Sequence, residues 1–258
     1  MRKLIWIAAA AALTACGGGG GSSAPPPPAN AAVDGMWVSS YTNSAGNAAD
    51  SIVLATADGN YFSVGVDTIT NCEGVGYGTL MSNVNDLTLS GTVVLLPCTF
   101  ADGTSVATLS GSGTIQAASS ISLTTLTLMS SMGNSYPADW LGQSMSLDPL
   151  YNEASSFAKV AGTYDVPASG GGVLGVITVA VDGTLTYGPD TNGCSASGSL
   201  SIIDAQHAIM GFTANFTNCG AFGAGMTGDA VLVDTVNPAE LLALFKNSTA
   251  VGAIAATQ

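Results

Sequence analysis

The sequence has few positively charged residues and a single histidine among its 258 residues. Lys and Arg together number 4 against 17 Asp and Glu, which gives a formal net charge of −13. Recognition of phosphate depends on clustered Lys and Arg, and a bidentate clamp on a carboxylate or phosphate depends on Arg. The composition therefore excludes nucleic acid as a partner and disfavours binding to anionic lipid headgroups.

Charged and aromatic residues are also scarce, at 8% and 7% of the chain, which limits the chemistry available to it. Hydrophobic residues nevertheless make up 47%, and 33 residues are glycine. A chain this apolar buries enough surface to fold, so a wholly disordered protein is excluded. The length predicts one large domain or two modest ones.

No residue pattern indicates catalysis. A Ser-His-Asp or Cys-His arrangement would have to use His207, but the chain has no Gly-x-Ser-x-Gly elbow, and the surroundings of His207 are typical of a turn. Residues 223–228 satisfy Gly-x-Gly-x-x-Gly, but we expect a strand after them, where a dinucleotide site requires a helix. We therefore expect neither an enzyme nor a cofactor.

The carboxylates are mostly expected to form turns. Asp58, Asp102 and Asp182 each precede a glycine, although paired carboxylates could also serve glycoside hydrolysis. The stretch Asp190-Thr191-Asn192-Gly193 shares residue types with a calcium loop but lacks the further acid of an EF-hand, so a weak exposed cation site is an alternative. Without a CxxC pair, and with one histidine, we expect no metal centre at the cysteines.

Residues 1–15 have the features of a secretory signal peptide. Arg2 and Lys3 precede an apolar run that is too short for a permanent membrane span. The segment that follows, Leu13-Thr14-Ala15-Cys16, resembles the lipobox of bacterial lipoproteins. In that family the cysteine thiol receives a diacylglycerol, the signal is cut before it, and the new amine is acylated. The resemblance implies that Cys16 is the lipid anchor, with a plain secretory peptide as the alternative.

Residues 16–32 are expected to tether this anchor to a folded body. Their glycines supply flexibility and their four consecutive prolines a stiffer spacer, although a Pro-rich recognition ligand is another use of such a segment. Gly17 stands where lipoproteins retained in the inner membrane usually carry Asp. The resemblance thus implies anchoring in the outer membrane, and several buried acyl chains would make it effectively permanent.

The five cysteines divide into one anchor and two pairs. Lipidation of Cys16 leaves Cys72, Cys98, Cys194 and Cys219, for which three connectivities exist. Cys72 and Cys98 are 26 residues apart and Cys194 and Cys219 are 25 apart, so the two pairs mark an internal repeat. We therefore predict one disulfide in each copy, Cys72–Cys98 and Cys194–Cys219, which would persist only outside the cytosol.

Further landmarks recur in the same order in both halves of the chain. Gly35-Met36-Trp37 matches Gly162-Thr163-Tyr164, and Asp58-Gly59 matches Asp182-Gly183. Both copies alternate apolar and polar residues as strands do, and each Asp-Gly pair predicts a hairpin with a two-residue turn. Strands at short, regular spacing predict an all-β protein of two tandem small antiparallel β-barrels.

Two segments depart from simple alternation. The strand expected over 120–128 changes its apolar parity at Thr124-Thr125, which predicts a β-bulge. Residues 237–240 contain the Asn, Pro and Glu of a helix N-terminus, which predicts a short helical turn. The apolar runs 241–247 and 250–256 then predict a final hairpin.

Gly-x-Trp at the first strand of a small antiparallel barrel is similar to the opening motif of the lipocalins. The resemblance implies lipocalin-like barrels over residues 33–148 and 149–258, although the Arg that lipocalins pack across this Trp has no counterpart after residue 16. The layout of lipobox, tether and paired Gly-rich β domains also resembles uncharacterised envelope lipoproteins of Proteobacteria. That resemblance carries no catalytic residues.

These features favour an outer-membrane-anchored lipoprotein with a non-catalytic structural or protein-binding role in the cell envelope. A lipocalin-like carrier of a small apolar ligand is the alternative, because Gly-rich strands with few aromatics could leave a barrel under-filled. A carboxylate-dependent hydrolase is more remote. A transmembrane barrel is also remote, since the chain ends in Gln258 rather than an aromatic residue.

Overall fold

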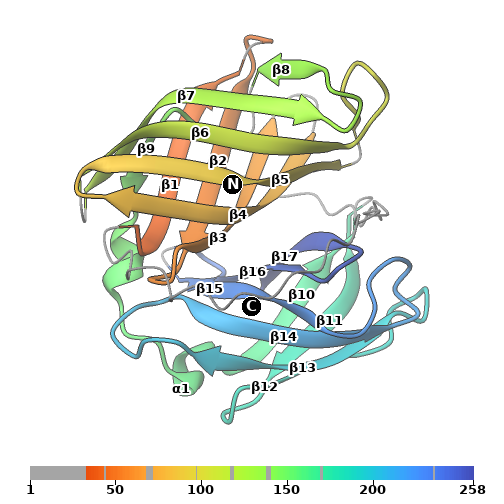
Figure 1. The fold of residues 1–258 in the computed structure, drawn as a ribbon. Coiled ribbons are helices and arrows are strands. Elements are labelled where there is room, and N and C mark those ends of the chain that lie inside the picture. The colour runs from red at the N-terminus through yellow and green to blue at the C-terminus, as the bar shows by residue number, and fades with distance from the viewer. Residues whose placement is uncertain are drawn as a thin grey trace, which may run out of the picture.

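A computed structural model shows two β-barrels in tandem (Figure 1). The expected signal peptide, Cys16 and the tether lie outside the residues that it describes. Within the described part of the chain, no helix has the length and apolar character needed to cross a membrane. The described residues are 33–43, 45–67, 72–96, 98–116, 119–137, 141–168, 171–234 and 236–258.

The first barrel is a ring of eight antiparallel strands. Strands β1 to β7 form a meander in which each pairs with the next, and β9 closes the ring between β7 and β1. Strand β8 pairs with β7 beside this ring. The strands are β1 (Gly35–Thr42), β2 (Ala48–Ala55), β3 (Asn60–Asp67), β4 (Glu73–Asn83), β5 (Asp86–Leu96), β6 (Val106–Gln116), β7 (Ser120–Ser130), β8 (Ser135–Pro137) and β9 (Ser144–Leu147).

The second barrel is an eight-stranded up-and-down meander that closes by pairing of β17 with β10. In the sequence, the short 3₁₀ helix η1 (Pro149–Asn152) and the helix α1 (Phe157–Val160) connect the first barrel to the second. Two closed antiparallel rings confirm the predicted fold class. The strands are β10 (Gly162–Pro167), β11 (Val173–Val179), β12 (Thr184–Tyr187), β13 (Ser195–Ile202), β14 (Met210–Thr217), β15 (Met226–Val233), β16 (Glu240–Lys246) and β17 (Val251–Thr257).

The aromatic residue of the Gly-x-aromatic motif has the same role in both barrels. Trp37 donates its Nε1 hydrogen to the carbonyl oxygen of Val33 at 2.8 Å, and the Tyr164 hydroxyl donates to the carbonyl oxygen of Val160 at 2.7 Å. Both rings are fully buried on the first strand of their barrel. Because a buried N–H or O–H needs a partner, the backbone four residues earlier completes each aromatic site.

The disulfides also occupy equivalent places. Cys72 precedes β4 and is bonded to Cys98, which follows β5. Cys194 precedes β13 and is bonded to Cys219, which follows β14. Each bond therefore ties the two ends of one antiparallel strand pair. This is the pairing within each repeat that the cysteine spacing predicts.

Apolar side chains form a core inside each barrel. In β5, Leu87 and Leu89 point into the core of the first barrel while Thr88 and Ser90 are exposed, as the alternation predicts. In the second barrel a cluster of stacked rings from β14 and β16 occupies the core. The space left beside them is about 10 Å³, about one water molecule. The second barrel is therefore not under-filled there.

Both Asp-Gly hairpins form, but the prediction of two-residue turns is wrong. The Thr56 amide bonds to the Asn60 carbonyl and the Gly59 amide bonds to the Thr56 carbonyl, and the loop at Gly183 repeats this pattern. Of the loop residues only the glycines have a positive φ, 83° at Gly59 and 85° at Gly183. Each loop is therefore a three-residue type I turn with a left-handed glycine, because a type I′ turn needs two positive φ values.

The predicted β-bulge is confirmed, whereas the prediction of a helical turn near the C-terminus is wrong. Ser112 pairs with Thr125 and Gly113 with Leu123, which leaves Thr124 as the extra residue of β7. Glu240 begins strand β16 instead of capping a helix, and β16 and β17 form the predicted final hairpin. Strand β16 is buried on both faces, one in the second barrel and the other against the first, and this packing outweighs the local capping signal.

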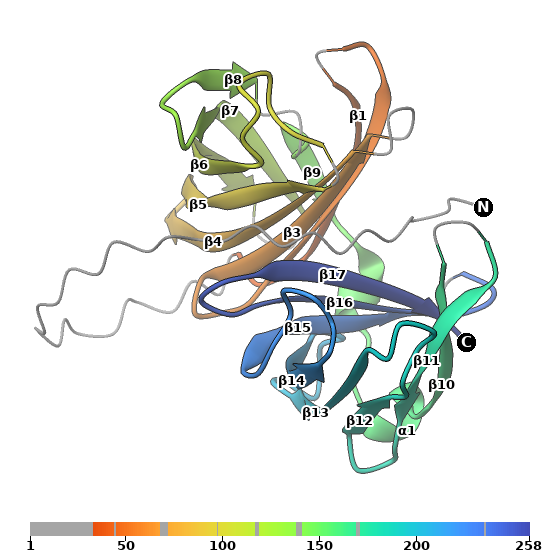
Figure 2. The same ribbon diagram turned by 90° about the vertical axis from the view of Figure 1, so that its right-hand side faces the viewer.

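The two barrels pack side against side, as two perpendicular views show (Figures 1 and 2). The contact joins the outer faces of strands in the first barrel to the outer faces of β15, β16 and β17. It explains apolar runs that do not alternate, because Val94 and Leu96 face the second barrel while their neighbours face the first core. The main contact residues are Met36, Leu54, Phe62, Val64, Leu150, Tyr151, Val231, Leu242 and Leu244.

Candidate functional site

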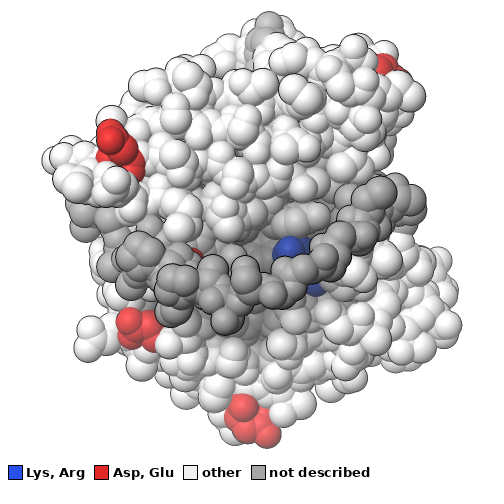
Figure 3. Space-filling model, viewed as in Figure 1, with Lys and Arg blue, Asp and Glu red and all other residues white. Residues whose placement is uncertain are grey.

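A cleft of about 570 Å³ lies between the two barrels. The first barrel lines it with the β2–β3 hairpin, including Asp58 and Phe62, and the second barrel lines it with Asp229 of β15 and Lys246 of β16. In Figure 3 the visible basic side chains lie in the hollow between the barrels. The volume falls within the roughly 300–1,000 Å³ of small-molecule sites. Because both barrels supply its walls, the cleft exists only in the assembled body.

Strand alternation places Asp229 at the inner end of this cleft. On β15, Thr227, Asp229 and Val231 point away from the barrel core, whereas Ala230 and its inward neighbours belong to that core. Val231 is fully buried between the barrels and Thr227 is exposed. Asp229 therefore lies where the open cleft meets the closed apolar interface.

Asp229 is a buried acid without a polar partner. Asp229 is only 7% exposed. None of the hydrogen bonds or ion pairs in the described part of the chain involves its carboxylate. Burial, and then the negative charges of Asp58 and Asp34, raise the pKa of Asp229 to about 7. A buried, unpaired carboxylate is costly in its ionised form, so Asp229 stands out among the cleft residues.

Lys246 spans the cleft toward the first barrel. It pairs in register with Thr227 and so projects from the same outer face as Asp229. Its ammonium lies 4.2 Å from the centroid of the Tyr77 ring, a cation–π contact across the barrels. Burial lowers the pKa of Lys246, and the ring face partly replaces the water that its charge has lost.

The carboxylate of Asp58 stabilises the hairpin turn at the cleft wall. It accepts hydrogen bonds from the Thr56 hydroxyl at 2.5 Å and from the amide and side chain of Asn60. Burial opposes its ionisation, but these hydrogen bonds outweigh burial and lower the pKa of Asp58. Asp58 therefore brings a fixed negative charge to the cleft and confirms the turn role predicted from Asp-Gly. Asp102 and Asp182 bond to their own turns in the same way.

Asp229 should make the stability of the second barrel depend on pH. Its pKa in the folded state, about 7, lies above the unfolded value near 4, so the folded state holds more protons between them. The free energy of unfolding therefore falls as pH rises from about 4 to 7. At pH 8 we expect urea denaturation to give Asp229→Asn a free energy of unfolding about 2 kcal/mol higher than that of the wild type. At pH 4 we expect no such increase. Identical differences at both pH values would contradict this assignment.

The single histidine lies in a second polar cluster beside the interface, not among the residues that line the cleft. His207 Nδ1 lies 3.1 Å from an oxygen of Asp204, and its ring stacks on Tyr151 with centroids 4.2 Å apart. The Tyr151 hydroxyl in turn lies within hydrogen-bonding reach of Asp34. The His207 amide bonds to the Asp204 carbonyl, which confirms the predicted turn. The cluster holds η1 and the 204–207 turn together.

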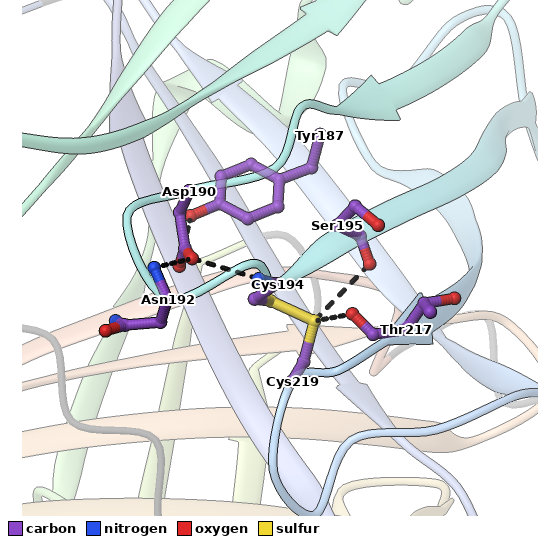
Figure 4. The surroundings of a disulfide bond; sticks show 7 residues. All are labelled: Tyr187, Asp190, Asn192, Cys194, Ser195, Thr217 and Cys219. Atoms are coloured by element: carbon purple, nitrogen blue, oxygen red, sulfur yellow. Dashed lines mark hydrogen bonds between the residues drawn. A yellow bond between two sulfur atoms is a disulfide. The ribbon is translucent and has the colours of Figure 1, made fainter.

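The loop beside the second disulfide uses its acid for structure (Figure 4). Asp190 accepts hydrogen bonds from the amides of Asn192 at 2.7 Å and Cys194 at 3.0 Å, and from the Tyr187 hydroxyl at 3.2 Å. The sulfur of Cys219 lies 3.3 Å from the Ser195 carbonyl oxygen. Both carboxylate oxygens are thus already occupied by the turn. In the part of the chain described, no three His, Cys, Asp or Glu side chains are grouped to hold a metal ion.

The remaining motif, residues 223–228, runs from a loop into β15: Gly223 and Gly225 lie in the loop, and Gly228 already pairs within the strand. Sequence reasoning missed Asp229 and Lys246 as residues of a shared site. The available signal was a charged residue inside the apolar run from Met226 to Val233, together with one of the few lysines at a strand end. A carboxylate flanked by residues buried on both faces of a strand indicates either a paired or a functional group.

Comparisons with known proteins add little. No family model matches the chain, and no curated protein matches it. Among solved structures, the chain is similar to a "putative outer membrane protein" from Bacteroides fragilis, with 13% identity and a TM-score of 0.21. The match covers 87% of this chain and 95% of that chain. A TM-score this low gives no basis for transferring a role.

Proposed function

We propose that this chain is a lipid-anchored lipoprotein of the outer membrane whose two-barrel body is a non-catalytic protein-binding module. The observation that carries the proposal is the interbarrel cleft of about 570 Å³, to which both barrels contribute. A partner segment seated there would contact two rigid walls at once. Sites on rigid strands hold their geometry better than sites on loops, which suits recognition.

The anchoring part of the proposal is supported by the lipobox sequence ending in Cys16 and by the Gly/Pro tether after it. Two disulfides fit a compartment outside the cytosol. For the second barrel, the space of about 10 Å³ beside the stacked rings supports an external binding site over a carrier role, because it admits no apolar ligand.

Substitution of the lipidated cysteine tests the anchoring. We expect Cys16→Ser to move the full chain from the membrane fraction to the soluble fraction, since loss of the acyl chains removes several kcal/mol of membrane affinity. Mass spectrometry of the N-terminal peptide should show acyl groups in the wild type and in the tether control Ser22→Ala. An unacylated residue 16 in the wild type would refute the anchor.

A bulky side chain in the cleft tests the binding role. Thr227 lines the cleft and is exposed, so Thr227→Trp should fill part of it without disturbing either core. We expect crosslinking of the wild-type full chain in cells to yield an adduct with a partner protein. In Thr227→Trp the yield of this adduct should fall about tenfold, as it does when a central contact of an interface is lost. Thr186→Trp, on the exposed face of β12, is the matched control and should keep the adduct. Equal yields from both variants would exclude the cleft as the binding site.

A further inference from the structure

We propose that the inner end of the cleft binds an organic cation, an alkylammonium or guanidinium group, through the carboxylate of Asp229. The cation is either a free amine or a Lys or Arg side chain of the protein partner. This inference rests on the binding role proposed above and names the chemistry recognised there.

The first support is the missing partner of Asp229. The residue is 7% exposed, lines the cleft, and has no hydrogen bond or ion pair to its carboxylate within the described part of the chain. Buried carboxylates in proteins are normally paired, because an unpaired ionised one loses its hydration without compensation. A cationic ligand supplies both the missing charge and the missing donors.

The second support is that the nearby lysine is held away from Asp229. The ammonium of Lys246 lies over the Tyr77 ring, and no ion pair within 4.0 Å joins it to Asp229 in the described residues. The strand register explains this, because Lys246 lies opposite Thr227 and only diagonally from Asp229. The acid at the inner end therefore stays open to a ligand.

The third support is the character of the surrounding walls. The negative charges of Asp58 and Asp34 act on Asp229, so the potential at the inner end favours a cation. Phe62 lines the same cleft from the outer face of β3 and offers apolar surface to an alkyl chain. A metal ion fits less well, since Ca²⁺ takes six to eight oxygen ligands and no three acidic side chains of the described residues are grouped.

Binding should strengthen with pH because the ligand needs the ionised carboxylate. The groups that face or act on Asp229 are Asp58 from the β2–β3 hairpin, Asp34 before β1, and Lys246 from β16. Asp229 itself titrates near 7 through burial, so its ionised fraction rises between pH 6 and pH 8. We expect affinity for the amine to rise by about tenfold over this range.

Calorimetric titration of the purified full chain in detergent tests the proposal at pH 8. One arm uses 1,5-diaminopentane and the other a capped alanine-rich peptide with a single lysine. We expect Asp229→Asn to weaken binding by about tenfold or more, as loss of a charge-assisted hydrogen bond does. The exposed Asp86→Asn changes the net charge equally and should alter affinity by less than about twofold. Lys246→Met removes a positive charge from the cleft wall and should tighten binding of both probes.

Binding of the diamine alone identifies a free amine, and tighter binding of the peptide identifies a partner side chain; either supports the proposal. The proposal is overturned if the wild type binds neither probe, if Asp229→Asn and Asp86→Asn behave alike, or if Lys246→Met abolishes binding. Should Asp229→Asn not fold, Thr227→Trp must block the titration instead. The anchoring and the protein-binding role are tested separately, by acylation of Cys16 and by crosslinking. A negative titration would therefore overturn the cation site without deciding the proposed function.

Discussion

Replacing Trp37 by alanine is expected to lower the free energy of unfolding of the first barrel by about 4 kcal/mol. The ring is fully buried in the core, and its Nε1 hydrogen satisfies the carbonyl of Val33. The substitution removes the packing of the largest core residue and leaves that carbonyl without its donor. Urea denaturation followed by far-ultraviolet circular dichroism measures the loss.

Two milder variants separate packing from hydrogen bonding. Trp37→Phe keeps most of the ring but loses the donor, and Tyr164→Phe does the same in the second barrel, where the hydroxyl bonds to Val160. We expect each to cost about 1–2 kcal/mol, the net value of a buried hydrogen bond with its unpaired carbonyl. If Trp37→Ala cost no more than Trp37→Phe, the ring would not be a core anchor.

Removal of the second disulfide by Cys194→Ser with Cys219→Ser is expected to destabilise the second barrel by about 3 kcal/mol. The bond closes a loop that contains β13 and β14. Without it the unfolded chain gains the conformational freedom of that loop, while the native pairing of the strands is unchanged. Urea titrations with and without a reductant measure the effect.

The reductant provides an internal control. It should destabilise the second barrel of the wild type by the same amount but have no effect on that barrel in the double variant. Cys72→Ser with Cys98→Ser should shift the first barrel instead, because that bond joins only the ends of β4 and β5. A reductant effect on the second barrel of the Cys194/Cys219 variant would show that another bond stabilises it.

The repeat and the strands could be predicted because they depend on short-range patterns. Alternation in β5 and the change of parity at Thr124 report directly which side chains face a core. The cysteine spacing was sufficient to pair Cys72 with Cys98, because the repeat leaves one connectivity with a bond in each copy.

The predictions were wrong where a short sequence motif is compatible with two backbone conformations. Asp58-Gly59 suits both a type I′ turn and a type I turn with a left-handed glycine, and the φ values show the second. Residues 237–240 suit a helix start, but the following residues pack on both faces as a strand. In each case the packed neighbours, which are distant in sequence, determined the outcome.

By itself, the sequence determined that this protein is all β, duplicated and paired by cysteine within each copy. These properties follow from periodicity and spacing, which act along the chain. The docking of one barrel on the other, and with it the meeting of Asp229, Lys246 and Asp58 around one cleft, was decided only by the tertiary structure. The physical reason is that such a site depends on which outer faces bury each other, and residues more than 150 positions apart share no local pattern that would reveal it.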